Sequence, residues 1–272
     1  MADWRSYDGI ADDHLRLWAP RFERAAAHLL ALARPPSAGR LLDVGTGTGA
    51  VPAALGERVD DLAEVVGCDL SLPMLSRARR RVPRLQVAVA AATRLPFPGA
   101  SFDVVTASFV LSHILDYPRA LGEALRVLKP GGVFAASDWA PAFPNGCEMT
   151  WWELLAVAVG EEALRRASEQ VVPSDFSDVE RLRRALVEGG FAEVRVQAVE
   201  LAFCEAVTDF VAGHELIAAG SFGRHSLGAD RWNAFHAEAL EQLRARFGEQ
   251  LRYTRSVVLA AGIKPGRASG ER

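Results

Sequence analysis

A short apolar segment that leads directly into three alternating glycines constrains the fold of this chain more than any other feature. Residues 41–44 have the length and composition of a buried strand, Gly45, Gly47 and Gly49 follow, and residues 50–55 suit a helix. Glycine adopts positive φ and leaves room where a Cβ would block a ligand, and the first N–H groups of a helix have no partner within it. The pattern therefore predicts a strand, a turn and a helix arranged around a polar or anionic ligand.

Two acids near this loop narrow the type of ligand. Gly45, Gly47 and Ala50 satisfy the dinucleotide pattern G-x-G-x-x-G/A, and Asp69 ends the next apolar segment, where an acid can bind ribose hydroxyls. Asp43 lies inside the strand, where its carboxylate would repel a phosphate and could orient an amino group directly or through water. The pattern favours a nucleoside-type cofactor without phosphates. An NAD-type oxidoreductase is the alternative that the loop permits.

Strand-like and helix-like segments alternate after the loop. Strands are expected at residues 41–44, 64–68, 85–90, 102–107 and 133–137. This alternation predicts an α/β fold with a parallel sheet, covered by helices on both faces, whose ligands bind at the carboxyl ends of the strands. The residues expected along that edge are Gly45, Asp69, Ala91, Ser108 and Asp138. The remaining sequence predicts a helix at 178–188, a strand at 193–199, helical structure over 204–247 and a last strand at 253–261.

The stretch from Arg40 to Ser137 resembles the class I S-adenosylmethionine-dependent methyltransferases in four motifs that occur in order, LLDVGTGTG, GCDLSLPML, TRLPFPGASFDVV and RVLKPGG. The resemblance implies a Rossmann-like, mostly parallel seven-stranded sheet of order 3-2-1-4-5-7-6, with the last strand antiparallel, and a helical cap. It also implies S-adenosyl-L-methionine as cofactor and methyl transfer to C, O or N of a small organic acceptor, as in quinone-biosynthesis and natural-product methyltransferases. A protein of this fold that binds the cofactor but catalyses a non-methylating step is a second alternative.

The resemblance also implies which residues contact the cofactor. They are Asp43, Gly45, Thr46, Gly47, Gly49, Asp69, Leu70, Met74, Ala91, Ala92, Thr93, Ser108 and Phe109. Asp69 would bind both ribose hydroxyls, and Leu70 and Met74 would flank the adenine. The family commonly has an acid near the adenine amino group where this chain has Ala91, so backbone groups and Thr93 would hold the adenine instead.

Two histidines are the catalytic candidates on the acceptor side. By resemblance, the Ser108 carbonyl would meet the methionine amino group, and His113 would be the titratable side chain nearest to the methyl group. A histidine, with its ordinary pKa of about 6.5, can take a proton from a phenol, hydroxyl or activated carbon. In the family, however, a histidine at this place often only packs or lines the pocket. His14 ends the segment YDGIADDH, where the family often has tyrosine; a surface histidine on an amphipathic helix is the alternative.

The motifs divide the chain into consecutive parts. They are an N-terminal helical lid at 1–39, a cofactor-binding α/β core at 40–138, an inserted cap or substrate segment at 139–177, the C-terminal part of the core with a helical insertion at 178–263, and a flexible tail at 264–272. The lid should be helical over residues 7–34 with an interruption near Pro20. An aromatic cluster in the cap segment comprises Trp139, Phe143, Trp151 and Trp152.

Composition and charge exclude several other classes of function. The formal net charge of −3 gives the chain no overall field for nucleic acid or an anionic membrane. The five arginines between residues 77 and 84 are expected to form the solvated face of a helix. The three cysteines lie far apart, which indicates reduced thiols and no metal site, and no apolar stretch approaches ~20 residues. We therefore expect a cytoplasmic enzyme that binds a small molecule, and the sequence does not indicate an oligomeric state.

Overall fold

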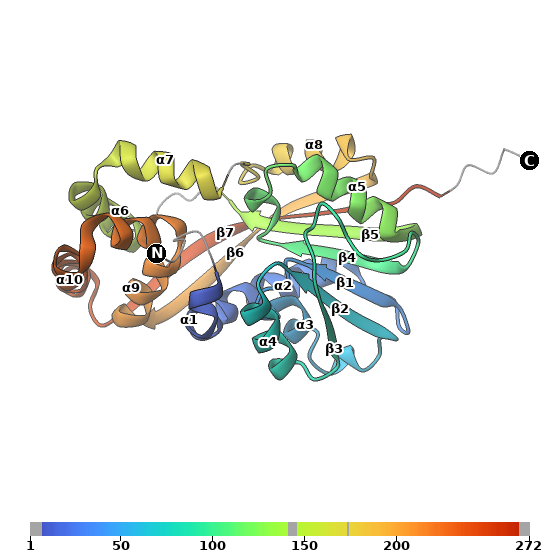
Figure 1. Cartoon of the computed structure of the whole chain (residues 1–272), viewed down its shortest axis with the longest axis horizontal. Coiled ribbons are helices and arrows are strands. Elements are labelled where there is room, and N and C mark those ends of the chain that lie inside the picture. Colours follow the sequence, from blue (N-terminus) through green and yellow to red (C-terminus); the bar gives the residue numbers. More distant parts are fainter. Residues whose placement is uncertain (1–6, 141–145, 173, 267–272) are drawn as a thin grey trace, which may run out of the picture.

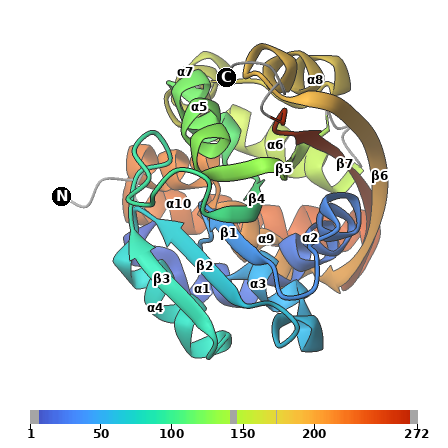
Figure 2. The same cartoon turned by 90° about the vertical axis from the view of Figure 1, so that its right-hand side faces the viewer.

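Residues 7–140, 146–172 and 174–266 are described by a computed structural model of the protein. They form a seven-stranded sheet of order β3-β2-β1-β4-β5-β7-β6, in which β7 runs antiparallel to both neighbours (Figure 1, Figure 2). The strands are β1 (Arg40–Val44), β2 (Glu64–Asp69), β3 (Leu85–Val89), β4 (Phe102–Ser108), β5 (Leu128–Trp139), β6 (Ala192–Ala206) and β7 (Gln250–Ile263). This arrangement confirms the fold class, the strand order and the antiparallel last strand that the resemblance implied.

Helices cover both faces of the sheet because its central strands are apolar on both sides. One face is covered by α2 (Ala19–Ala33), α3 (Ala50–Ala54) and α4 (Leu72–Arg81), and the other by α5 (Tyr117–Val127) and α8 (Val179–Glu188). Leu41 of β1 packs in the first core with Leu29, whereas its neighbour Leu42 packs in the second core with Leu121. A shift of one residue would exchange these two faces, so burial on both sides fixes the register of the strand.

Local signals in the sequence set the helix ends. Pro20 stands in the first turn of α2, where its missing N–H costs no hydrogen bond, and separates α2 from α1 (Ala11–Leu17) as predicted. The Asp178 carboxylate caps α8 by accepting hydrogen bonds from the N–H groups of Glu180 (2.7 Å) and Arg181 (3.2 Å). The short 3-10 turns are η1 (Asp8–Ile10), η2 (Gly56–Val59) and η3 (Leu111–His113).

The last two strands are longer than the sequence pattern predicted. β6 continues to Ala206 and pairs there with Gln250 at the start of β7. The helix predicted over 204–247 is therefore wrong at its start, because Cys204 belongs to the strand. Leu201 and Phe203 are buried while the residues beside them are exposed, so the alternation of a strand continues past residue 199.

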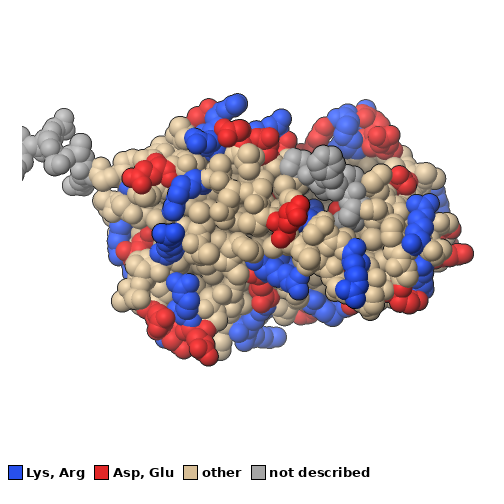
Figure 3. All heavy atoms as spheres, turned by 180° about the vertical axis from the view of Figure 1, so that it is seen from behind, with Lys and Arg blue, Asp and Glu red and all other residues tan. Residues whose placement is uncertain are grey.

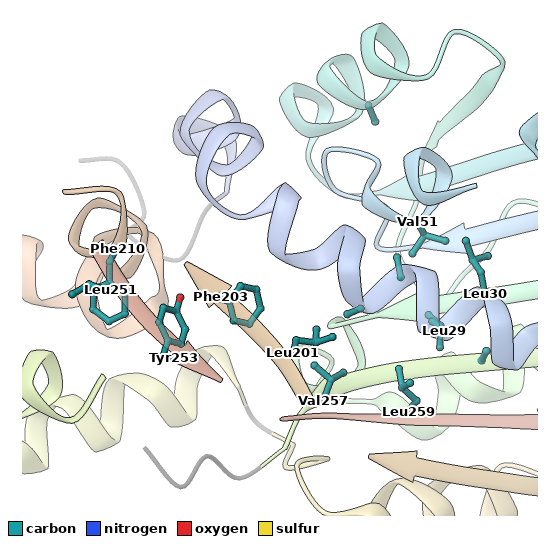
Figure 4. Packing of buried hydrophobic residues seen from close by; sticks show 14 of the residues in the cluster. Leu29, Leu30, Val51, Leu201, Phe203, Phe210, Leu251, Tyr253, Val257 and Leu259 are labelled. Carbon is teal, nitrogen blue, oxygen red and sulfur yellow. The ribbon is translucent and has the colours of Figure 1, made fainter. Parts of the chain in front are cut away.

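A group of helices that we call the cap lies where β6 ends and β7 begins. It comprises α6 (Gly146–Val159), α7 (Glu161–Val171), α9 (Val207–Leu216) and α10 (Ala218–Phe247), and α10 is broken at Gly228. The two pairs lie together in Figure 1 although they come from separate parts of the sequence. Their core continues from the sheet along Leu201, Phe203, Phe210 and Tyr253 (Figure 4). Residues 207–247 thus join the predicted segment 139–177, of which Phe143 lies outside the described residues.

The predicted turn at residues 128–132 is an irregular start of β5. Pairing with β4 shifts register across it, and Gly131 adopts a left-handed conformation with φ of 78°. The Gly131 N–H donates to the Lys264 carbonyl (2.9 Å), and the Lys264 N–H donates to the Gly132 carbonyl (2.8 Å). Lys264, predicted to begin a flexible tail, is thus held by β5; residues 267–272 lie outside the described part.

The surface carries charges of both signs. Figure 3 shows one face, on which lysines and arginines alternate with aspartates and glutamates and do not gather into one basic stripe. Among the described helices, none combines the length and the apolar composition needed to cross a membrane.

Candidate functional site

The glycine loop between β1 and α3 is the first element of the site. Gly45, Gly47 and Gly49 have φ values of 67°, 53° and 81°, in the region that side chains rarely adopt. A Cβ on Gly45 would lie 2.8 Å from the Cβ of Val110, and one on Gly49 would lie 3.2 Å from the Cβ of Ala78. A Cβ on Gly47 would meet nothing within 4 Å. The outer glycines therefore permit close packing, whereas Gly47 borders open space where a ligand can approach the backbone.

Asp69 closes the opposite side of this loop from the end of β2. Its carboxylate accepts a hydrogen bond from the Gly47 N–H (2.9 Å) and another from the Ser71 N–H (2.9 Å). Burial raises the pKa of Asp69, and these N–H groups act against that rise. The structure therefore brings the two strongest predictions from the sequence, the glycine loop and the ribose-binding acid, into direct contact.

Two buried side chains support the loop, that of Asp43 in β1 and that of Thr46 in the loop itself. The Asp43 carboxyl is 1% exposed and accepts a hydrogen bond from the Thr106 hydroxyl (2.7 Å). Burial raises its pKa to about 7, although that hydroxyl favours the ionised form. Thr46 is also buried, next to Gly67 of β2. It fits there because Gly67 has no side chain: a Cβ on Gly67 would lie only 2.8 Å from Cγ2 of Thr46. Both residues support the loop from inside.

The residues predicted to surround the adenine follow β2 and β3, with Met74 in α4, and have different exposures. Leu70 is 73% exposed, whereas Met74 is 2% exposed and leaves little surface for a ligand. Ala91, Ala92 and Thr93 are half-buried, and the chain turns there through a bridge between Ala91 and Arg94. These residues offer backbone groups and the Thr93 hydroxyl to a ligand.

The chain leaves β4 through Phe109, whose ring packs against aromatic residues of β5 and α2. Phe109 adopts φ of 54°, which is unusual for a residue with a side chain, and its N–H donates to the Ser137 carbonyl (2.8 Å). The Ser108 and Ser137 hydroxyls are hydrogen bonded at 2.9 Å. The ring centroid of Phe109 lies 4.6 Å from that of Trp139 and 4.8 Å from that of Phe22. Backbone strain at this point thus directs an aromatic side chain into a wall beside the strand ends.

Both predicted histidines approach the same tyrosine. The Tyr7 ring meets His14 edge-on at 6.2 Å and His113 edge-on at 6.3 Å. His14 is half-buried, with Nδ1 3.3 Å from the Thr48 hydroxyl of the glycine loop, and burial lowers its pKa to about 4. The side chain is thus partly covered, and the alternative interpretation of a surface histidine is not tested by this arrangement. His113 is exposed, and its Nδ1 lies 2.9 Å from the Val171 carbonyl at the end of α7.

The N-terminal helices are fastened over the site by contacts that the sequence pattern did not reveal. The Ser71 hydroxyl donates to Asp8 (2.6 Å), and the Arg77 guanidinium donates to both oxygens of Asp12 (2.8 and 2.7 Å). On the cap side, Arg16 pairs with Asp209 of α9 at 2.8 Å. Arg77, from the arginine run that was expected to face solvent, therefore pairs with an acid of the N-terminal segment. The acids of that segment were the signal in the sequence that could have indicated such a pair.

The described residues hold no group of three or more histidines, cysteines or acids that could bind a metal ion. The site instead combines an open glycine loop, a carboxylate across from it, an aromatic wall at the ends of β4 and β5, and two histidines, His113 after β4 and His14 on α1. Such a site suits a nucleoside-type ligand next to a flat organic molecule.

The sheet order and the site together define a Rossmann-like protein of the methyltransferase type, and comparisons with known proteins agree. A family model described as a methyltransferase domain matches residues 42–136. The chain is 41% identical over 142 residues to a demethylmenaquinone methyltransferase of Beutenbergia cavernae, which covers 50% of this chain and 57% of that relative. It is 33% identical over 190 residues to a demethylmenaquinone methyltransferase of Clavibacter sepedonicus, covering 66% of this chain and 73% of the relative. The chain belongs to the class I S-adenosylmethionine-dependent methyltransferase family.

A solved structure shares the fold at lower sequence similarity. The Haemonchus contortus phosphoethanolamine N-methyltransferase 2, in complex with S-adenosyl-L-methionine, aligns with a TM-score of 0.57 at 18% identity, over 97% of this chain and 60% of that one. The match with the first of the quinone relatives spans little more than half of that relative's length.

Proposed function

We propose that this protein transfers the methyl group of S-adenosyl-L-methionine to a small quinone-like acceptor. The observation that carries the proposal is the Asp69 carboxylate lying across the glycine loop, with open space beside Gly47. Family membership supports the cofactor, and the names of the relatives support a quinol as acceptor. An NAD-type oxidoreductase does not agree with that membership.

The residues present fit the cofactor. The free ribose hydroxyls of a nucleoside can donate to the Asp69 carboxylate. The nucleoside can also lie against the backbone of Gly47, in the space that a Cβ there would occupy. The half-buried turn at Ala91 and Thr93 would hold the adenine, and the Ser108 carbonyl would accept from the methionine amino group. When bound, the cofactor supplies an electrophilic methyl group on a sulfonium, which leaves as a neutral thioether after taking the electron pair of the broken C–S bond.

The chain's own residues then have three tasks. His113 can serve as the proton acceptor: a carbonyl only accepts hydrogen bonds, so Nδ1–H must donate to Val171 and Nε2 keeps a free lone pair. The quinol hydroxyl loses its proton to that nitrogen as the neighbouring ring carbon forms its bond to the methyl carbon. The keto form so produced then loses the proton from that ring carbon and takes up one on oxygen, which restores the quinol. His14, with a pKa of about 4, stays neutral near pH 7 and is a weak base, so it would orient the acceptor. The rings of Phe22, Phe109 and Trp139 would exclude water and align the acceptor.

Two measurements test the proposal. The first is calorimetric titration with S-adenosylhomocysteine. The second is mass spectrometry after incubation of the protein with S-adenosyl-L-methionine and a panel of reduced 1,4-naphthoquinone, reduced benzoquinones, phenols and amines. We expect binding and a quinol product heavier by one methylene group. Binding without any methylated product would favour the non-methylating alternative, and absence of binding would overturn the cofactor assignment.

A substitution tests the proton acceptor separately. His113→Asn should lower kcat by a factor of about 10² to 10⁴, the usual range for a general base, and leave the affinity for S-adenosylhomocysteine unchanged. His225→Asn is the matched control, because His225 is exposed on α10. An unchanged rate in His113→Asn would remove His113 from the reaction.

A further inference from the structure

A buried charge cluster lies where the cap meets the sheet, and the proposed function uses none of it. Glu148 of α6 and His214 of α9 are 4% and 3% exposed. The Glu148 carboxylate lies 3.2 Å from Nε of Arg255 on β7 and 3.6 Å from Nε2 of His214. On the other side of His214, Nδ1 lies 2.8 Å from the Phe210 carbonyl. Three separate elements thus meet at one carboxylate.

One role of this cluster is to hold the cap in place. Burial alone would raise the pKa of Glu148, but the His214 hydrogen bond and the Arg255 charge outweigh burial and lower it. A second pair, the buried Arg21 with the half-buried Glu205, lies beside it, and the Tyr253 hydroxyl donates to the same Glu205. Removing one member of such a cluster leaves an unpaired buried charge, so each member contributes to the docking of the cap.

Arg255 has a second neighbour that this structural role does not explain. Its guanidinium carbon lies 3.7 Å from the centre of the Trp139 ring. Trp139 pairs with Val257 across the sheet, and Arg255 lies two residues before Val257, so both side chains point to the same face. The Trp139 ring also lies 4.6 Å from the ring of Phe109, with an interplanar angle of 36°. The indole therefore contacts both a guanidinium and Phe109, the residue that follows β4.

We propose that Arg255 is a positioning residue that sets the wall of the acceptor site through Trp139. The inference rests on the proposed function, because it takes the aromatic wall to face the acceptor. Glu148 fixes the guanidinium, the guanidinium fixes the plane of the indole, and the indole with the tilted ring of Phe109 forms the aromatic wall at the ends of β4 and β5. The cofactor loop lies at the ends of β1 and β2 and has no part in this chain of contacts.

The substitution Arg255→Lys separates positioning from cap docking. A lysine keeps a positive charge for Glu148 but lacks the planar group that stacks on an indole. Arg252→Lys is the matched control, because Arg252 lies on the same strand and is exposed. The protein is labelled with 5-fluorotryptophan, and the resonance of Trp139 is assigned by its loss in Trp139→Phe. Reduced 1,4-naphthoquinone serves as acceptor and 1,4-naphthoquinone, with S-adenosylhomocysteine present, as binding probe.

We expect Arg255→Lys to move the fluorine resonance of Trp139 and to raise the KM for the quinol about tenfold, the size of a lost cation–π contact in a desolvated setting. An interaction made equally before and during methyl transfer changes KM alone, so kcat and the affinity for S-adenosylhomocysteine should stay as in the wild type. Arg252→Lys should change none of these quantities.

Two failures are distinguishable. If wild type binds the quinone but never methylates the quinol, the proposed function fails, while weaker quinone binding with a moved Trp139 resonance in Arg255→Lys still supports positioning. If Arg255→Lys leaves the resonance and the quinone affinity unchanged, Arg255 serves only to dock the cap and the inference is overturned, whatever the wild type catalyses. Absence of quinone binding to the wild type also overturns it.

Discussion

Gly45 is the position where the loop tolerates a side chain least, and Gly45→Ala measures why. The substitution has two costs in the folded state. The left-handed backbone, with φ of 67°, costs about 1–2 kcal/mol for a residue with a Cβ. The new Cβ would also lie 2.8 Å from the Cβ of Val110 and closer still to its Cγ2, and overpacking of this kind costs about 1–3 kcal/mol. We expect a loss of about 2–5 kcal/mol in the free energy of unfolding, a large part of the total for a domain.

Gly47→Ala is the matched control, because it shares the backbone cost but not the overlap. Its φ is 53° and its Cβ would meet nothing within 4 Å, so we expect a loss of only about 1–2 kcal/mol. The same methyl group would project into the space assigned to the cofactor. Gly47→Ala should therefore weaken binding of S-adenosylhomocysteine more than it weakens the fold.

Urea unfolding followed by circular dichroism gives the free energies, provided that the slopes stay equal, and calorimetry gives the affinities. In a Val110→Ala background the overlap with the two Cγ atoms is removed while the 2.8 Å approach of the two Cβ atoms remains, so Gly45→Ala should cost less there than in wild type but still more than Gly47→Ala. The reasoning fails if Gly45→Ala is no more destabilising than Gly47→Ala, or if Val110→Ala does not reduce its cost.

Two further predictions concern the acids of the site. Asp69→Asn keeps the shape of the side chain but loses its charge, so it should weaken binding of S-adenosylhomocysteine about 10- to 100-fold in calorimetry. The control Asp60→Asn, on the surface, should leave the affinity unchanged. Equal affinities of Asp69→Asn and wild type would remove Asp69 from the ribose site. The Asp43 carboxyl keeps its proton in the folded state up to about pH 7, while the unfolded chain loses it near pH 4, so this group lowers stability as the pH rises through that window, by at most about 4 kcal/mol. Urea unfolding at pH 5 and pH 8 should therefore show a smaller fall in stability for Asp43→Asn than for wild type, and parallel curves for the two proteins would contradict the raised pKa.

The sequence predicted the core of the sheet because its strands are buried on both faces and read as short apolar runs. β1 and β2 lie within a residue of their predicted bounds for this reason. The second half of β6 was not predicted as strand because only one side of it is buried. Leu201 and Phe203 alternate with exposed residues, and this short pattern runs directly into the sequence of the following helix. Tertiary pairing with β7, which the local sequence does not encode, decided the outcome.

The candidate site was predictable where function depends on backbone shape and poorly predictable where it depends on long-range contacts. Three glycines at fixed spacing predict a loop with left-handed backbone conformations. An acid at the end of the next strand lies beside that loop, because neighbouring parallel strands end at the same edge of the sheet. No spacing rule connects Arg255 with Trp139, or Arg77 with Asp12, because these pairs are brought together by the strand register and by helix docking. The burial of His14 likewise follows from the way the N-terminal helices close over the loop.

The β6–β7 hairpin has a consequence for how the molecule comes apart. β7 pairs with β5 in the middle of the sheet and with β6 along its whole length, and the same two strands continue into the cap. The sheet and the part of the cap formed by α9 and α10 therefore share one main-chain ladder. Amide hydrogens of β7 next to the cap should exchange with solvent as slowly as those next to β5, since opening either end breaks the same cooperative unit. A movement of α9 and α10 relative to the sheet would therefore bend the two-stranded ribbon of β6 and β7.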